Sequence, residues 1–193
     1  MPQIIVDAIL RAWDQTCCHI ASGHAHQFAG RRKEGLVLGH LGRILTTSPD
    51  VNAATEVGFE RWTIDLVGSR DKMKVAVEGK YKILSDGAVP DNRKAAFFDI
   101  YKLEQCVDRG GYSGEMFIWL TNQRDYLRPA NGDSADFSTH DGRVYQAGTA
   151  LRAQRARNAM PLPFTLSRSY KFTWKRILNT DWRTLVIDVR PTA

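Results

Sequence analysis

The chain has 193 residues, of which 43% are hydrophobic and 25% charged. This length and composition are typical of one globular domain and exclude a disordered tail protein. The cysteines are odd in number and two are adjacent (Cys17 and Cys18), which excludes a disulfide scaffold and indicates a reducing compartment. No apolar run approaches the roughly 18 residues of a membrane span, and no basic region precedes the first apolar stretch. We therefore expect a single cytoplasmic domain, residues 1–193, with no membrane partner.

The positive charge is concentrated in one segment. The chain carries 27 basic and 21 acidic residues, a net charge of +6. Residues 142–180 include eight basic residues and no acidic one, so this segment carries +8 and the remainder −2. Such a segment favours a polyanion partner, because neutralising phosphates releases their counterions; a solvated surface is the alternative. The predicted nucleic-acid-binding residues are Arg152, Arg155, Arg157, Arg168, Lys171 and Lys175.

The apolar pattern predicts two helices at the start of the chain. Apolar residues recur every three or four positions over residues 4–20 and again over residues 36–45, which places them on one face of a helix. Ser48 and Pro49 end the second helix, because proline cannot continue it.

Alternation then replaces the helical period. Apolar and polar side chains alternate over residues 62–67 and 73–82, which predicts two strands joined as a hairpin. Residues 93–108 return to helical spacing and are followed by a pair of glycines, which end a helix. Residues 115–121 contain an uninterrupted apolar run, typical of a strand that is covered on both faces.

The last third of the chain is predicted to contain a loop, a helix and strands. Residues 128–142 are rich in turn-forming residues and predict a surface loop. Residues 146–158 are predicted to be helical. Residues 164–174 and 183–189 contain β-branched and aromatic residues that favour strands, with the aromatic side chains in the core.

This order of elements predicts an α/β fold with a central mixed β-sheet flanked by helices. Within the single domain we expect helices over residues 1–50, a core over residues 56–122 that carries the chemistry, and a basic part over residues 143–193.

The predicted hairpin carries the informative side chains. If residues 71–72 form a two-residue turn, Asp65 lies opposite Glu78, with Cβ atoms about 4.5 to 5.5 Å apart. Lys80 then lies on the same face, opposite Thr63. A longer turn would leave the carboxylates diagonal but still on one face. The side chains that the short turn places on the other face are Ile64, Leu66, Val75 and Val77.

Two carboxylates beside a lysine suit phosphodiester hydrolysis. A hard cation held by oxygen ligands neutralises charge on the phosphoryl group and lowers the pKa of a bound water. A lysine can hold that water and stabilise developing negative charge. Asp65 and Glu78 are the predicted ligands and Lys80 the water-positioning residue. Mg²⁺ is the expected cation, since two protein carboxylates leave positions for water and phosphate.

These residues resemble a known signature. Asp65, followed after twelve residues by Glu78-Gly79-Lys80 on the next strand, resembles the catalytic motif of the PD-(D/E)XK nuclease superfamily, the restriction-endonuclease-like fold. The resemblance covers about residues 34–122. It implies that Asp65 and Glu78 bind Mg²⁺, that the backbone carbonyl of Gly79 can join them, and that Lys80 is catalytic. Mn²⁺ is expected to substitute.

The sequence departs from the superfamily pattern at one position, where Ile64 replaces the name-giving proline. Many members add a glutamate from the preceding helix, and Glu34 is a better candidate for this ligand than Glu56 or Glu60. Some members carry a polar residue on the following helix. The candidates for that auxiliary position are Lys102 and Gln105.

The resemblance implies cleavage of DNA or, less often, RNA. We therefore predict a Mg²⁺-dependent DNA endonuclease. If it is a type II restriction enzyme, a homodimer on a palindromic site is expected. The alternative is a catalytically inactive nucleic-acid-binding or assembly subunit on the same fold. A third class is a metabolic enzyme in which residues 78–80 are structural.

Two other clusters contain metal-ligand residue types. Cysteines and histidines gather over residues 17–26, but their spacing fits no common zinc pattern, so core cysteines and loop histidines are expected. Acidic and amide residues gather over residues 131–141 without the spacing of an EF-hand, and we expect a solvated loop there.

Overall fold

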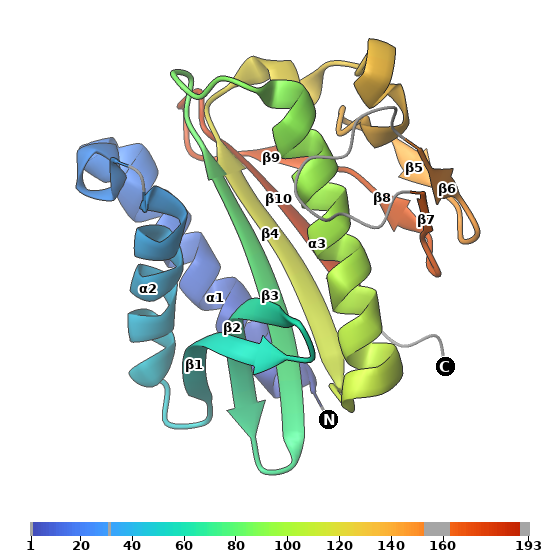
Figure 1. The fold of residues 1–193 in the computed structure, drawn as a ribbon. Coiled ribbons are helices and arrows are strands. Elements are labelled where there is room, and N and C mark those ends of the chain that lie inside the picture. The colour runs from blue at the N-terminus through green and yellow to red at the C-terminus, as the bar shows by residue number, and fades with distance from the viewer. Residues whose placement is uncertain (1, 31, 153–162, 190–193) are drawn as a thin grey trace.

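A mixed sheet forms the centre of the fold. The computed structural model describes residues 2–30, 32–152 and 163–189, and within them six strands pair in the order β1-β2-β3-β4-β10-β9 (Figure 1). Strands β3 and β4 are parallel and the other neighbours are antiparallel. The strands are β1 (Asn52–Phe59), β2 (Trp62–Arg70), β3 (Met73–Lys82), β4 (Gly114–Thr121), β9 (Trp174–Arg176) and β10 (Arg183–Val189). The predicted mixed sheet is confirmed.

Helices cover both faces of this sheet. Helices α1 (Gln3–His19) and α2 (Lys33–Thr46) lie on one face, joined by short helical turns over Ile20–His24 and Ala25–Phe28. Helix α3 (Val89–Gly110) connects β3 to β4 across the other face (Figure 1). A crossover of this kind is what joins two parallel neighbours. No helix in the described part of the chain is long and apolar enough to cross a membrane.

The two faces contain separate cores. On the α1–α2 side, Trp13 and Leu41 pack with Val77 of β3, and none of the three side chains is more than 1% exposed. On the α3 side, Phe97 packs with Ala76 of β3 in a second core. Because successive residues of a strand point to opposite faces, Glu78 belongs to the α3 side, like Ala76.

The described segment between β4 and β9 packs over α3. It contains short helical turns over Arg124–Leu127 and Gly132–Phe137 and two small two-stranded sheets. The small sheets pair β5 (Val144–Tyr145) with β8 (Tyr170–Lys171) and β6 (Ala150–Leu151) with β7 (Phe164–Thr165). The aromatic side chains of residues 170–174 are buried there, as predicted.

One predicted element is contradicted by the structure, and one strand was not predicted. The helix predicted over residues 146–158 is absent from its described part, where a turn with Gly148 at φ +84° leads into β6; residues 153–158 lie outside the described residues. Pairing of β6 with β7 supplies the hydrogen bonds that a helix would have made. Strand β1 was not predicted, because its mostly exposed sequence lacks a clear apolar alternation.

Candidate active site

The hairpin of β2 and β3 has the short-turn register. Arg70 pairs with Met73, and the ladder continues to Leu66 opposite Val77. One further step places Asp65 across from Glu78. The two-residue turn is therefore confirmed, and the carboxylates of Asp65 and Glu78 lie close enough to interact where the ladder ends.

Beyond this pair, the two strands separate. The Oδ2 atom of Asp65 accepts a hydrogen bond of 3.0 Å from the backbone N–H of Gly79. The carbonyl of Thr63 instead accepts a hydrogen bond of 2.9 Å from Nζ of Lys102. The predicted pairing of Thr63 with Lys80 was therefore wrong. Separation of the strands leaves an opening beside Asp65 and Glu78.

The orientation predicted for Ile64 was also wrong. Its side chain packs in the α3-side core, whereas Leu66 packs in the α1–α2 side core. The irregularity lies where β1 passes Asp65: Glu56 has a φ of +53°, between the ladder pairs Thr55–Leu66 and Val57–Ile64. A left-handed residue interrupts the alternation of side chains in its own strand, so β1 is irregular at the same point at which Ile64 and Leu66 of β2 face opposite cores.

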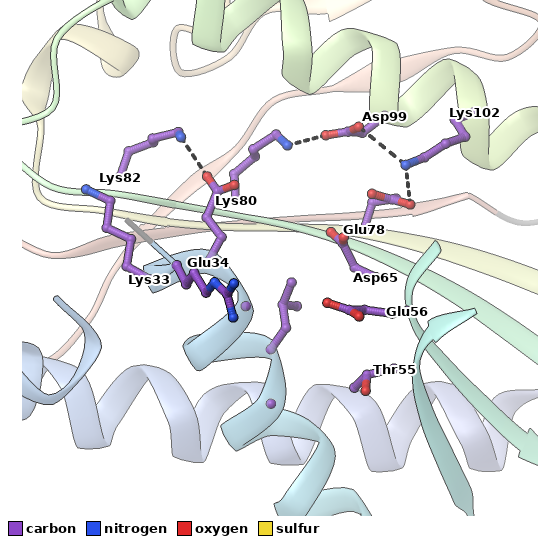
Figure 2. Close-up of a pocket in the computed structure, with 14 residues that line it drawn as sticks. Lys33, Glu34, Thr55, Glu56, Asp65, Glu78, Lys80, Lys82, Asp99 and Lys102 are labelled. Atoms are coloured by element: carbon purple, nitrogen blue, oxygen red, sulfur yellow. Dashed lines mark ion pairs between the residues drawn. The ribbon is translucent and has the colours of Figure 1, made fainter. Parts of the chain in front are cut away.

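A cavity of about 700 Å³ opens at this separation. Its walls come from the start of α2, from β1, β2 and β3, and from α3. Figure 2 shows the carboxylates of Glu56, Asp65 and Glu78 pointing into it from three neighbouring strands. The charged residues that line it are Arg32, Lys33, Glu34, Glu56, Asp65, Glu78, Lys80, Lys82, Asp99 and Lys102.

Ion pairs connect β3 to α3 along one side of the cavity (Figure 2). Nζ of Lys102 lies 2.6 Å from Oε1 of Glu78 and 3.6 Å from Oδ1 of Asp99. Nζ of Lys80 lies 2.5 Å from Oδ2 of Asp99. Asp99 is therefore a further carboxylate of the site, and the sequence did not predict it.

Burial raises the pKa of both predicted ligands. For Asp65, burial outweighs the hydrogen bond from Gly79, and the charge of Asp99 raises the pKa further. For Glu78, burial raises the pKa well above its usual range, and the charges of Asp99 and Asp65 add to the effect despite Lys102. The charge of Asp99 thus makes ionisation of both Asp65 and Glu78 less favourable, the charge of Asp65 does the same for Glu78, and a bound cation would relieve that repulsion.

The pKa values of Lys80 and Lys102 are raised as well, but here the cause is the neighbouring negative charge and not burial. Burial alone would lower the pKa of Lys80, but the charges of Asp99 and Glu34 raise it above its usual value. Burial likewise opposes protonation of Lys102, and the charges of Asp99 and Glu78 raise its pKa. Both side chains are therefore ammonium ions at neutral pH. Lys80 is suited to hold a water or stabilise negative charge, not to accept a proton.

The donor set fits a hard divalent cation. Asp65 and Glu78 offer oxygen ligands, the type that Mg²⁺ prefers. Oε1 of Glu78 is buried beside Lys102 yet accepts no well-directed hydrogen bond. In the part of the chain that the structure describes, no group of three or more Asp, Glu, His or Cys is arranged to hold a metal. A cation at Glu78 would have to compete with Lys102 for this oxygen.

Close packing explains the glycine between the two charged residues of β3. A Cβ at Gly79 would lie 2.7 Å from Cδ2 of Leu38 on α2. The backbone of β3 can therefore approach α2 this closely only without a side chain at position 79. A metal-binding role for the Gly79 carbonyl stays a prediction.

The other predicted site residues have different environments. Glu34 lines the cavity, and its Oε1 lies 2.6 Å from Nζ of Lys82. Glu56 lines the cavity too, whereas Glu60 does not. Lys102 contacts Glu78 directly, but Gln105 is buried in α3 outside the cavity lining. The signal for Asp99 was its position one helical turn before Lys102.

The predicted nucleic-acid-binding residues differ in exposure where the structure describes them. Arg168 is mostly buried, with its guanidinium 2.7 Å from Asp108 and 3.1 Å from Glu115, so it stabilises the packing of α3 and β4. The side chains of Lys171 and Lys175 are exposed, as is that of Arg152. Arg155 and Arg157 lie outside the described residues.

The two other clusters have structural roles where the chain is described. Cys17 is buried in the α1–α2 side core, whereas the ring of His19 stacks on His24 at a centroid distance of 4.1 Å. In the 131–141 segment, Asp141 accepts a hydrogen bond of 2.9 Å from the backbone N–H of Trp174. Asp136 likewise accepts one of 3.1 Å from the backbone N–H of Arg152. These carboxylates hold the surrounding turns.

Comparison with known proteins gives no match. No family model matches the chain, and no curated protein and no solved structure resembles it significantly. The residues of the cavity are therefore the basis for inferring a function.

Proposed function

We propose that this protein is a Mg²⁺-dependent DNA endonuclease with a restriction-endonuclease-like core. One observation carries the proposal: Asp65 and Glu78, from paired strands, line one open cavity together with Lys80. Raised carboxylate pKa values support it, because buried repelling carboxylates are typical of sites that bind a cation.

The carboxylates and the lysine of the cavity would have separate roles. Asp65 and Glu78 would hold Mg²⁺ or Mn²⁺, with the Gly79 carbonyl as a further donor and Glu34 as a more distant candidate. When bound, the cation supplies charge neutralisation at the phosphoryl group and a bound water of lowered pKa. Lys80 would orient the attacking water and stabilise negative charge on the phosphate oxygens.

The substrate contacts are proposed on charge. Arg32 and Lys33 line the cavity at the start of α2, where a helix N-terminus also favours an anion. Lys171 and Lys175 are exposed cations that could contact phosphates farther along a duplex. A homodimer acting on both strands and a cytoplasmic location belong to the same proposal.

A cleavage assay tests the proposal. Purified protein is incubated with supercoiled plasmid and with labelled DNA and RNA oligonucleotides, in Mg²⁺, in Mn²⁺ and in EDTA. We expect cleavage of DNA that requires the metal. Intact substrates under all metal conditions would contradict the proposal.

One observation favours a second candidate. Lys102 already neutralises Glu78, as expected of a catalytically inactive nucleic-acid-binding or assembly subunit. In that case calorimetry would show salt-dependent DNA binding with the same affinity in EDTA and in Mg²⁺. DNA binding that strengthens with metal would exclude this candidate.

Cleavage is expected to rise with pH through a range above that of ordinary carboxyls, whose pKa values lie near 4. The pKa values of Asp65 and Glu78 are both raised, so these groups keep their protons to higher pH, and a protonated carboxyl cannot ligate the cation. Single-turnover rates at subsaturating Mg²⁺ between about pH 5 and 8 would show it. More Mg²⁺ should move the inflection to lower pH, and a flat profile would contradict the assignment.

A further inference from the structure

Four buried charges alternate in a row from β3 to α3: Glu78, Lys102, Asp99 and Lys80 (Figure 2). Their side chains are between 2% and 13% exposed. Buried ions at such depth are costly to leave without a partner, so losing one pair in this row favours re-pairing of its members. The row therefore has two possible pairings, of which the structure shows one.

Distances show which member can change partner. Lys102 is in contact with Glu78 at 2.6 Å, and Oδ1 of Asp99 lies 3.6 Å from the same ammonium. Lys102 also donates a hydrogen bond to the carbonyl of Thr63, which keeps its Nζ near both carboxylates. A small movement would complete a Lys102–Asp99 pair, for which the spacing of three residues along α3 is suitable.

We propose that Lys102 is an exchangeable counter-ion of Glu78 and that Asp99 is a positioning residue for Lys80. A divalent cation that binds Glu78 displaces Lys102, which then pairs with Oδ1 of Asp99. This second contact shares the charge of Asp99 and weakens its hold on Lys80, whose ammonium contacts Oδ2 of the same carboxylate, so that Lys80 can move toward the cavity. The inference rests on the metal site of the proposed function. It makes the release of Lys80 depend on the presence of the cation.

Formal charges are consistent with this exchange. The charged side chains that line the cavity comprise five basic and five acidic residues, so their formal charges sum to zero. A bound divalent cation raises that sum to +2, which favours a phosphodiester, and takes the place of Lys102 as the counter-ion of Glu78. Lys80, the water-positioning residue of the proposed function, is held by Asp99 in the structure, and the exchange gives it a route to the cavity.

Calorimetric titration of the protein with Ca²⁺ and with Mn²⁺, without DNA, tests the exchange. Lys102→Met should bind the metal about tenfold more tightly and Asp99→Asn about tenfold more weakly, and Asp99→Asn should have little further effect in the Lys102→Met background. In an exchange the effect of Asp99→Asn on metal affinity requires Lys102, whereas charges that act independently would give the same effect in both backgrounds. Equal effects of Asp99→Asn in both backgrounds would overturn the proposal.

Two further variants serve as a control and as a substitute in this titration. Lys33→Met removes a cation from the same cavity wall, one that pairs with Asp86 and not with Glu78, and it should change metal affinity by less than about twofold. An equal tightening by Lys33→Met would overturn the exchange. Lys102→Gln keeps a donor for the Thr63 carbonyl and serves if Lys102→Met does not fold; it should also bind metal more tightly.

Nitrogen-15 spectra of the lysine ammonium groups test the release of Lys80 directly. Saturating Ca²⁺ should shift the signals of Lys102 and Lys80 in the wild type and leave that of Lys33 in place. An unchanged Lys80 signal at saturating metal would overturn the proposal. These outcomes are separable from the nuclease: exchange without cleavage contradicts only the proposed function, and cleavage without exchange contradicts only this inference.

Discussion

Glu78→Gln is expected to lower the single-turnover rate of DNA cleavage by about a thousandfold or more, because it removes a charged ligand from the proposed metal site. The amide has nearly the same size as the carboxyl, and Lys102 keeps its contacts with Asp99 and the Thr63 carbonyl. The fold should therefore survive, and thermal unfolding with circular dichroism would check that it does.

Glu60→Gln is the matched control for this variant. It makes the same chemical change on an exposed residue of the neighbouring β1–β2 turn that does not line the cavity. Its cleavage rate should stay within about twofold of the wild type, as expected for a surface substitution. If Glu78→Gln cleaves as well as Glu60→Gln, Glu78 is not a metal ligand and the proposed site is wrong.

Local sequence was sufficient for the position of the two carboxylates. Alternation predicted the faces of Leu66, Val75 and Val77 correctly, though not that of Ile64, and a two-residue turn at 71–72, with Asp71 at φ +54°, set the register that brings Asp65 to Glu78. Both effects act between residues that are close along the chain, so periodicity and turn chemistry could reveal them.

The opening beside these carboxylates could not be predicted in the same way. It lies beside the left-handed Glu56 of β1 and the hydrogen bond from Lys102 to Thr63, which joins residues 39 positions apart. Asp99 was missed for a related reason. Helical spacing places it one turn from Lys102, but only tertiary packing brings it to Lys80.

The basic segment shows the limit of counting charges along the sequence. Arg168 contributes to the charge of +8, yet its guanidinium is paired with Asp108 and Glu115 from α3 and β4. Burial raises the pKa of Glu115 to about 9, even with Arg168 beside it. A net charge therefore predicts a binding surface only after such internal pairs are known.

Glu104→Ala is expected to destabilise the protein by about 3 kcal/mol, because it leaves several donors without their acceptor. Glu104 of α3 is fully buried, and its carboxylate accepts hydrogen bonds from the backbone N–H of Ser167 at 2.9 Å, from that of Arg168 at 3.0 Å and from the hydroxyl of Tyr170 at 2.6 Å. These bonds fasten the segment before β8 to the helix that carries Asp99 and Lys102. Urea unfolding would measure the loss as a lower midpoint.

Asp108→Ala is the matched control, one turn later on the same helix. The Asp108 side chain is 40% exposed and pairs with Arg168 at 2.7 Å, and a pair this open to solvent contributes at most about 1 kcal/mol. Equal losses for the two variants would show that Glu104 acts only as another surface charge. A larger loss for Glu104→Ala, with slower cleavage, would show that the segment before β8 also keeps α3 in position over the cavity. In that case the ion pairs of Asp99 and Lys102 with β3 depend on Glu104, because the hydrogen bonds of its carboxylate hold α3 in position.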